Sequence, residues 1–485
     1  MNKYAILFLL SLPWSSVQIL YGQWQPDLRL TYDDSVSTNF FNYAWCTAAQ
    51  GDTVYVVWDD NREGSYEIYF KRTVDNGTSW TPDILLSSTG FDSHYGHIAV
   101  DGCTVHVIWQ DEKDGNCEIY YKSSSCGGDN WTGDVRLTND ESRSSAPSIA
   151  VNDSVVHIVW VDERANGPEL FYKRSINAGS SWEPDRQLTD DPLATCFPSI
   201  SVSDTMVHIT FAIAWDIYYL RSTDDGVTWG EIKRLTNDGD VSWFPSIAST
   251  DTMVHIVWHD QRDGNTDIFY KRSCSGGTIW EDDTNLTANI YNSNIPSLAV
   301  SDSMIHVVWY DYRDGNYEIY YKGSYDTGIS WEQDIRLTDC GGTSKSPCIC
   351  ASTSYIHVIW VDDRDGNYEI YYKNDPTGNF NIEPKNKIET RCAISVEIFP
   401  NPFQEKTRIV YSVEHDAQDL QIGIYDITGK CIKSYYCFAQ NALCGTLFWD
   451  GTDETGFSVP NGVYLVVLCD RESTEKTTVI RLRKH

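Results

Sequence analysis

One short pattern recurs seven times along this chain, and this periodicity constrains the fold more than any other feature. Six copies place a tryptophan at the end of a β-branched run, and the fourth copy places Phe211 there. The six are Trp58, Trp109, Trp160, Trp258, Trp309 and Trp360, so successive copies lie 51 residues apart except for one step of 47. A fixed period of this kind, built from short β-runs, is typical of repeated four-stranded sheets.

Each copy contains four expected strands, which the third copy shows clearly. P-S-I-A-V at 147–151 is followed by V-V-H-I-V-W at 155–160, by E-L-F-Y-K-R-S at 169–175 and by a short strand around 186–189. Apolar and β-branched residues alternate in these runs, and Asn-Gly or Asp-Gly pairs separate the second from the third, which predicts strands joined by tight hairpins. The sequence therefore predicts an all-β fold with a seven-bladed β-propeller over residues 23–380.

The seventh copy is incomplete, and its missing part stands at the other end of the chain. The copy stops after 371–373 and lacks the W-x-x-D-x-R-L-T segment, which occurs alone at residues 24–31. We expect residues 24–31 to form the outer strand of the last blade. This would close the ring and remove the exposed sheet edge that an open array leaves.

The two ends of the chain differ from the repeats. A basic start and an apolar run at 4–12 predict a secretory signal peptide over residues 1–22. Residues 381–393 are polar and are expected to form a linker, and short strands over 394–485 predict a small Ig-like β-sandwich. No later segment has the apolar length of a membrane span, so we expect no membrane insertion. The protein is predicted to be exported and monomeric.

Charge and cysteine content narrow the class of partner. The formal net charge of −32 argues against nucleic acid and anionic membranes as partners, because both would be repelled. The 14 cysteines permit disulfides in an exported chain, but none forms a C-x-x-C pair, and no metal or cofactor is predicted. Cys431, Cys437, Cys444 and Cys469 cluster in the C-terminal domain, where their pairing stays open.

The turn between the third and fourth strands carries a repeated motif. It reads Thr73-x-Asp75-x-Gly77-x-x-Trp80 in the first copy and recurs from Ser222 and from Ser324. This motif resembles the Asp-box (BNR repeat) of sialidases and related propellers. The resemblance implies a folding element in which Asp caps the turn and Trp packs between strands, on the face opposite the ligand site. It does not by itself imply sialidase activity.

The hairpin between the second and third strands reads D-x-R-D-G-N. It starts at Asp260, Asp311 and Asp362, with weaker copies at three other blades and none in the fourth. Two interpretations are open. The arginines of these hairpins, Arg62, Arg262 and Arg313 among them, would clamp a sugar acid, or the motif is a turn with a salt bridge or hydrogen bond between neighbouring blades. A histidine recurs on the second strand and is expected to form a packed layer; its copies are His106, His157, His208, His255, His306 and His357.

Function is expected where the repeat is broken, on the face that carries D-x-R-D-G-N. The fourth copy replaces its hairpin with a short turn at 214–216, which would open a notch in the rim. Histidine, tyrosine and acidic side chains around a central depression suit acid/base chemistry. The predicted catalytic residues are His94, His97, Arg143 and Tyr310, and the predicted ligand-binding residues are Asp59, Arg62, His259, Arg262, Arg313, Trp243 and Tyr291.

Three functions compete for this face. A passive glycan-binding propeller explains the regularity best. A sialidase-type glycoside hydrolase is implied by the Asp-box resemblance, but the chain has no early R-I-P-type motif and no arginine triad that stands apart from the repeat. A polysaccharide lyase would use His94, His97 and Arg143. In each case the expected partner is an extracellular glycan or glycoprotein.

The last domain carries motifs of its own. They are F-P-N-P-F at 399–403, Y-D-I-T-G-K at 425–430, W-D-G-T-D at 449–453, P-N-G-V-Y at 460–464 and the basic end R-L-R-K-H at 481–485. Together they resemble the type IX secretion sorting domain of Bacteroidetes-like bacteria. The resemblance implies that residues 394–485 contact the type IX secretion machinery and that the protein is secreted or displayed on the outer-membrane surface.

Overall fold

The structure is a computed structural model. It describes residues 24–375 apart from 40–45, 166, 192, 194, 238, 302–303 and 353. In the C-terminal domain it describes the strands within 394–481 and some of the segments between them. Every regular element in these ranges is a β-strand. The described residues therefore contain no helix that could cross a bilayer. The signal peptide predicted at 1–22 and the linker predicted at 381–393 lie outside the described residues.

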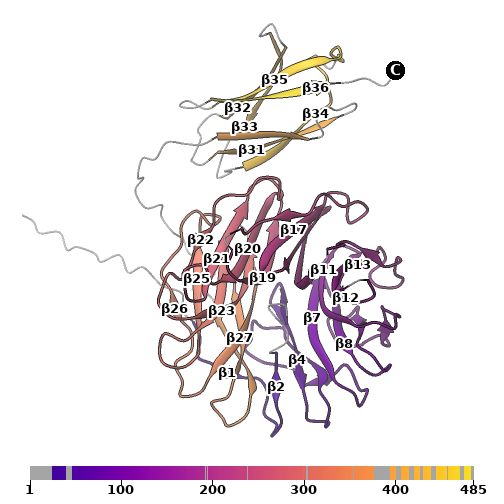
Figure 1. The fold of residues 1–485 in the computed structure, drawn as a ribbon, viewed down its shortest axis with the longest axis vertical. Coiled ribbons are helices and arrows are strands. Elements are labelled where there is room, and N and C mark those ends of the chain that lie inside the picture. Colours follow the sequence, from indigo (N-terminus) through magenta and orange to yellow (C-terminus); the bar gives the residue numbers. More distant parts are fainter. Residues whose placement is uncertain are drawn as a thin grey trace, which may run out of the picture.

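Residues 24–375 form seven sheets, each built from one sequence repeat (Figure 1). The first three blades contain β2 (Ser37–Thr38), β3 (Thr47–Gln50), β4 (Thr53–Asp60), β5 (Glu67–Thr73) and β6 (Ile84–Leu85); β7 (Ser93–Asp101), β8 (Thr104–Asp111), β9 (Glu118–Ser124) and β10 (Val135–Arg136); and β11 (Ser144–Asn152), β12 (Val155–Asp162), β13 (Glu169–Ser175) and β14 (Arg186–Gln187).

The remaining blades repeat this order. They contain β15 (Thr195–Ser203), β16 (Met206–Ile213), β17 (Asp216–Ser222) and β18 (Lys233–Arg234); β19 (Ser242–Thr250), β20 (Met253–Asp260), β21 (Asp267–Ser273) and β22 (Thr284–Asn285); β23 (Ser293–Ser301), β24 (Met304–Asp311), β25 (Glu318–Ser324) and β26 (Ile335–Arg336); and β27 (Ser344–Ala351), β28 (Ile356–Asp362) and β29 (Glu369–Asp375) with β1 (Leu28–Arg29).

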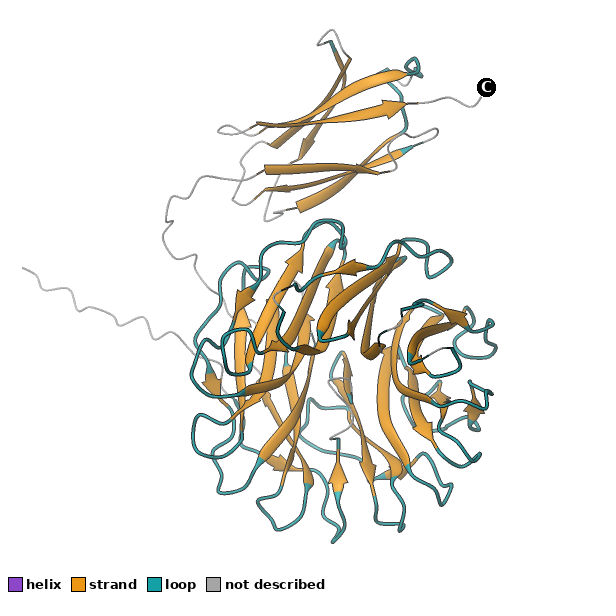
Figure 2. Cartoon of the chain, in the orientation of Figure 1, coloured by secondary structure: helices purple, strands orange, loops and turns teal. Residues whose placement is uncertain are grey.

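The first strands of neighbouring blades contact one another around a complete ring, from β3 through β7, β11, β15, β19, β23 and β27 back to β3. The sheets radiate from this ring, as Figure 2 shows for the strands. The predicted seven-bladed β-propeller is thereby confirmed.

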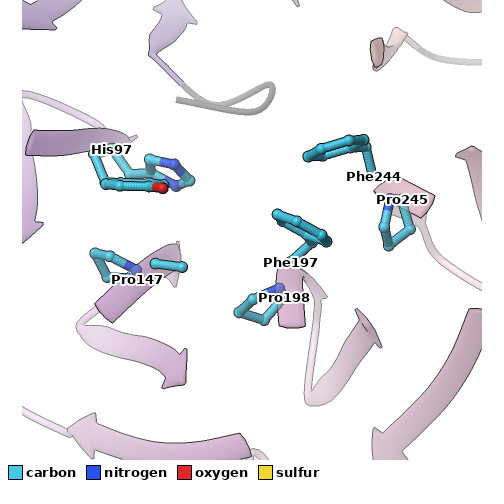
Figure 3. Close-up of a pocket in the computed structure, with 8 residues that line it drawn as sticks. His97, Pro147, Phe197, Pro198, Phe244 and Pro245 are labelled. Atoms are coloured by element: carbon cyan, nitrogen blue, oxygen red, sulfur yellow. The ribbon is translucent and has the colours of Figure 1, made fainter. Parts of the chain in front are cut away.

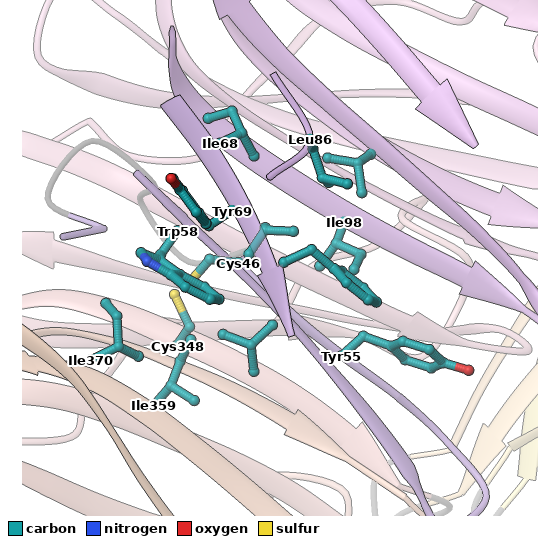
Figure 4. Close-up of a cluster of buried hydrophobic side chains, with 14 of the residues drawn as sticks. Cys46, Tyr55, Trp58, Ile68, Tyr69, Leu86, Ile98, Cys348, Ile359 and Ile370 are labelled. Carbon is teal, nitrogen blue, oxygen red and sulfur yellow. The ribbon is translucent and has the colours of Figure 1, made fainter. Parts of the chain in front are cut away.

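The N-terminal segment closes the ring as expected. β1 pairs with β29, with Leu28 opposite Tyr372 and Arg29 opposite Tyr371. The two oxygens of Asp27 hold Arg364 at 2.7 Å and Lys373 at 2.8 Å, which adds ion pairs to the short ladder. Behind this seam, side chains of the first and last blades pack into one buried cluster that includes Trp58, Cys46 and Cys348 (Figure 4).

The turns between third and fourth strands bind neighbouring blades together. In the first blade, Asp75 accepts the backbone N–H of Ser79 at 2.8 Å, and the ring of Trp80 packs edge-on against Tyr372 of the last blade at 5.0 Å. Gly77 has φ +91°, and a Cβ there would lie 2.2 Å from the Tyr372 hydroxyl oxygen, so the turn requires glycine. The repeated Gly and Trp are therefore contacts between blades.

The repeated histidines form the buried layer that the sequence predicts. In five blades Nδ1 of this histidine lies 2.7–2.8 Å from a tyrosine hydroxyl on the neighbouring strand of the same sheet, as for His255 and Tyr270. The last blade repeats the pair at 2.8 Å. Burial lowers the pKa of His255 to about 3, so the ring is neutral in the fold.

Residues 394–481 form two sheets, in the orders β30-β31-β34 and β33-β32-β35-β36. The strands are β30 (Ile394–Phe399), β31 (Thr407–Val413), β32 (Leu420–Asp426), β33 (Cys431–Cys437), β34 (Cys444–Trp449), β35 (Gly462–Cys469) and β36 (Thr474–Arg481). Ile409, Ile422, Ile424, Trp449 and Val466 are fully buried, so both sheets contribute to the core. The predicted Ig-like sandwich is confirmed. Cys431 is a free thiol, and the side chains of the three other cysteines in the domain lie outside the described residues.

Candidate functional site

Six inner strands share a bulge where they meet the face that carries the D-x-R-D-G-N hairpins. The pairing register shifts there, for example between His94 and His97 on β7 and between Trp243 and Ser246 on β19. One residue in each bulge has a left-handed backbone, with φ between 45° and 58°: Tyr95, Ala146, Phe197, Phe244, Ile295 and Ser346. Such a conformation is strained for a side chain that is not glycine, and bulges re-aim side chains next to functional sites.

Bulge residues of the second to fifth blades, and the prolines that follow three of them, line a small cavity. Tyr95, His97, Ala146, Phe197 and Phe244 line an axial cavity of about 10 Å³ together with Pro147, Pro198 and Pro245 (Figure 3). A cavity of this size holds about one water molecule. A sugar ring does not fit inside this cavity.

Four aromatic rings of the fourth and fifth blades form a cluster beside this cavity, which we call the aromatic platform: Phe197, Trp215, Trp243 and Phe244. The rings of Trp215 and Trp243 are stacked, 4.6 Å apart and 15° from parallel. Phe197 lies 4.2 Å from Phe244 and 5.5 Å from Trp243. Trp215 is 53% exposed, so the platform presents a large aromatic surface to solvent.

The notch that the sequence predicts in the fourth blade is present, and Trp215 forms part of it. Strand β16 ends at Ile213 and β17 begins at Asp216, which leaves a two-residue turn. The turn residues Ala214 and Trp215 have φ of 48° and 79°. A turn of this kind normally uses Asn or Gly because both central residues are left-handed. The carbonyl of Trp215 accepts the N–H of Ser242 at 2.8 Å, which fixes the strained turn against the next blade.

A histidine–carboxylate pair joins the first and second blades on the same face. His94 Nδ1 lies 3.2 Å from Asp59 Oδ2, and the ring of Tyr66 lies 4.9 Å from that of His94. Complete burial raises the pKa of Asp59. Burial alone would lower the pKa of His94, but the carboxylate of Asp59 outweighs this effect and raises it. The structure thus brings together two residues that the sequence selects separately.

The other two predicted histidines are buried. His97 is 4% exposed and lies in the wall of the axial cavity, and His259 lies beside Phe244 with 5.1 Å between the ring centres. Nδ1 of each has no hydrogen-bond partner among the described residues. Burial lowers the pKa to about 3 for His97 and to about 4 for His259, so both rings are neutral at ordinary pH. His94 and His97 therefore do not form one catalytic pair.

The arginines of the D-x-R-D-G-N hairpins are occupied. Arg262 Nη2 contacts Asp260 at 2.6 Å and Nη1 contacts Asp283 at 2.7 Å. Arg313 and Arg62 make the same two contacts, and Arg62 also reaches Asp33 at 2.8 Å. The motif is thus a turn held by ion pairs. These ion pairs link the hairpin to the outer strand region of its own blade. The expected link toward the neighbouring blade is made by hydrogen bonds, since the motif's Asn316 donates to the carbonyl of Gly342, on the loop that leads into the next blade, at 2.7 Å.

The remaining predicted residues are spread over other blades. Tyr310 packs against Tyr317 at 5.2 Å, and Lys345 Nζ lies 4.6 Å over the ring of Tyr317. Tyr291 is exposed on the loop before the sixth blade, and Arg143 is exposed on the loop before the third. Burial raises the pKa of the nearby Cys117 thiol to about 12, although Arg143 acts to lower it. These residues share the face but do not converge on one point.

Sequence reasoning did not select Phe197, Tyr66, Tyr317 or Lys345 for the site. The signal for Phe197 was present, since it precedes the proline of the repeated x-P-S segment. The structure shows why that position matters, because the bulge turns its side chain toward the axis. No metal cluster of three or more His, Cys, Asp or Glu side chains occurs in the described part of the chain.

Comparisons with known proteins agree with the fold. Residues 402–471 match the family model of the FlgD Ig-like domain. No curated protein matches the chain by sequence. The solved structure of the polysaccharide lyase Uly1 is similar with a TM-score of 0.51 and 9% identity, over 73% of this chain and 99% of that one.

Two further structures are more distant. Phage phi92 endosialidase has a TM-score of 0.46 and 9% identity, over 94% of this chain and 87% of its own. Trypanosoma rangeli sialidase has a TM-score of 0.40 and 11% identity, over 79% and 83%. At these identities the similarity concerns the fold, and function has to be argued from the site.

Proposed function

We propose that this protein is a glycan-recognition propeller that binds sugar rings on its aromatic platform. The observation that carries the proposal is Trp215, which is half exposed, stacked on Trp243 and held in a strained two-residue turn. Exposed aromatic patches mark interaction sites, and strain that persists in a fold points to function. A glycan as ligand is also supported by the similarity of the fold to a polysaccharide lyase and by the resemblance of the Gly-Trp turns to the Asp-box.

The geometry explains how the platform would select a sugar. A pyranose ring has a face of C–H groups that packs on an aromatic ring, and Trp offers the largest such area at a small loss of side-chain freedom. The notch at 214–216 leaves the platform open where other blades have longer hairpins. The axial cavity is too small for a sugar ring, so the sugar would lie on the surface of the platform.

A glycan array with the full chain tests this proposal. We expect binding to at least one glycan class, and we expect Trp215→Ala to abolish it. Phe91→Ala is the matched control, because Phe91 is also 53% exposed on this face and lies on another blade. Equal binding by wild type and the Trp215→Ala variant would refute the platform, and unchanged thermal unfolding of the variant would show that its fold is intact.

Glycan cleavage is a second candidate function, and the His94–Asp59 pair favours it. A histidine whose protonated form is stabilised by a buried carboxylate can serve as a general acid or base. The reaction would be hydrolysis of the sialidase type or β-elimination of the lyase type. Incubation of the protein with a glycan would establish cleavage if it gives new reducing ends, from hydrolysis, or an unsaturated product, from β-elimination, and if the product is not formed by His94→Gln. Binding without either product would leave recognition as the function.

We also propose that the protein is exported, through the signal peptide at 1–22, and passed across the outer membrane by the type IX machinery through residues 394–485. The motifs of that segment and its Ig-like fold support this route. Deletion of 394–485 in a host with this machinery should retain the propeller in the periplasm, as cell fractionation would show. Surface delivery of the truncated chain would refute the sorting role.

A further inference from the structure

Most cations of the propeller are already neutralised. Nearly every lysine and arginine within residues 24–375 forms an ion pair with an Asp or Glu. Three others donate to backbone carbonyls in or beside the Gly-Trp turns of the opposite face: Arg186 to Val227, Arg221 to Gly276 and Lys233 to Thr278. Arg143 and Lys345 are the remaining two.

Neither of these two cations belongs to the aromatic platform. Arg143 lies on the loop before the third blade, and Lys345 lies on the inner strand of the seventh blade, over Tyr317. The platform residues belong to the fourth and fifth blades. The fourth blade also carries Arg234, whose Nη2 contacts Asp216, the residue after Trp215, at 2.5 Å. A sugar acid resting on Trp215 would have to displace that carboxylate to reach a guanidinium.

The hairpin arginines do not supply one either. A guanidinium recognises a carboxylate best through two parallel N–H donors. Arg262 and Arg313 already use both terminal nitrogens on carboxylates of their own blade, at 2.6–2.7 Å. Recruiting them would leave the buried carboxylates of Asp260 and Asp311 without their cation, which is strongly unfavourable. The net charge of −32 further disfavours the approach of a polyanion.

The shape of the site adds a second constraint. The axial cavity of about 10 Å³ has no room for a terminal sugar. The exposed ring of Trp215 lies outside this cavity and suits several consecutive rings of a chain that lies across the face. We infer that the ligand is an internal stretch of an uncharged pyranose polysaccharide. This inference rests on the proposed function and names its substrate class; a neutral ligand is neither a sialoside nor a substrate for β-elimination.

The test compares neutral and acidic oligosaccharides on the full chain, with hexagalacturonate as the acid matched in length to the neutral hexaoses. Tryptophan fluorescence is titrated with the hexaoses of cellulose, laminarin, xylan and mannan, and with hexagalacturonate and sialyllactose, at low and high salt. We expect one or more neutral hexaoses to bind at least about tenfold more tightly than either acid, with no salt dependence. Trp215→Ala should weaken this binding about tenfold or more, and Phe91→Ala should not.

The possible failures can be told apart. One failure is that an acidic oligosaccharide binds more tightly than the neutral ones, in a way that salt, Arg143→Ala or Lys345→Ala weakens. If this binding still depends on Trp215, the ligand is not neutral, but the protein still recognises glycans. If a monosaccharide or a chain end binds with the same affinity as the hexaose, the inference that the ligand is an internal stretch of a chain is wrong. Binding of no glycan at all, in solution or on the array, would overturn both this inference and the proposed function.

Discussion

Two glycines with the same backbone show what single residues contribute. Gly328 in a Gly-Trp turn has φ +88°, and Gly264 in a D-x-R-D-G-N hairpin has φ +92°. A Cβ at Gly328 would lie 2.0 Å from the Tyr270 hydroxyl oxygen, whereas a Cβ at Gly264 would meet nothing within 4 Å. We expect Gly264→Ala to lower the free energy of unfolding by about 1 kcal/mol through backbone strain alone. Gly328→Ala should lower it by about 2–4 kcal/mol, because it also overpacks the contact between two blades.

Denaturant unfolding of the two variants measures this difference directly. Equal losses in both variants would contradict the claim that the glycine is required by the neighbouring blade. A larger loss of unfolding free energy in Gly264→Ala than in Gly328→Ala would also contradict this claim.

The element on which the ring depends is β1 with the residues that flank it. Strand β1 has two residues, so its hydrogen bonds alone give a weak closure, and Asp27 adds ion pairs to Arg364 and Lys373. Asp27→Asn should lower the free energy of unfolding by about 1–3 kcal/mol, since it leaves the partly buried Lys373 without its carboxylate and Arg364 with Asp362 alone. Asp34→Asn is the control, because Asp34 is exposed on the loop that follows, and a surface change of this kind has an effect within about 0.5 kcal/mol.

Thermal unfolding checks this prediction, and the same loss in both variants would show that Asp27 does not hold the seam. Limited proteolysis adds a second readout, since a weakened seam should expose residues 24–31 to cleavage sooner in Asp27→Asn.

The whole propeller should be sensitive to acid, because its histidine layer is buried and neutral. Burial lowers the pKa to about 3 for His208, His255, His306 and His357, well below about 6.5 in the unfolded chain. The unfolded state therefore binds more protons between these two values, so stability falls as the pH drops below about 6.5. Each such histidine contributes about 1.4 kcal/mol per pH unit in this window. The hairpin aspartates act in the same direction at lower pH, since Asp260 and Asp362 have lowered pKa values.

Unfolding temperature measured from pH 7.5 to 4.5 tests this expectation. The fall should be steep across the lower half of that range, and His255→Gln should make it shallower by the share of one histidine. A flat profile down to pH 4.5 would mean that the histidines are protonated in the folded state.

The repeat by itself determined the seven blades, the closure by residues 24–31 and the notch at 214–216. These follow from the sequence because each blade is specified by alternation and turn residues within about 50 positions. The sequence also indicated that the repeated histidines are scaffold, since six equivalent residues cannot mark one site. It left D-x-R-D-G-N open between a turn and a sugar-acid clamp.

Only the tertiary structure decided what the unrepeated residues do. Trp215 and Trp243 are stacked because neighbouring inner strands and a strained turn bring them together, and Asp59 meets His94 across a blade boundary. The sequence could not show that Arg262 is engaged by Asp283, 21 positions away, or that bulge residues of four blades line one small cavity. Such contacts depend on side-chain directions set by bulges and left-handed backbone, which are fixed when the blades pack around the axis.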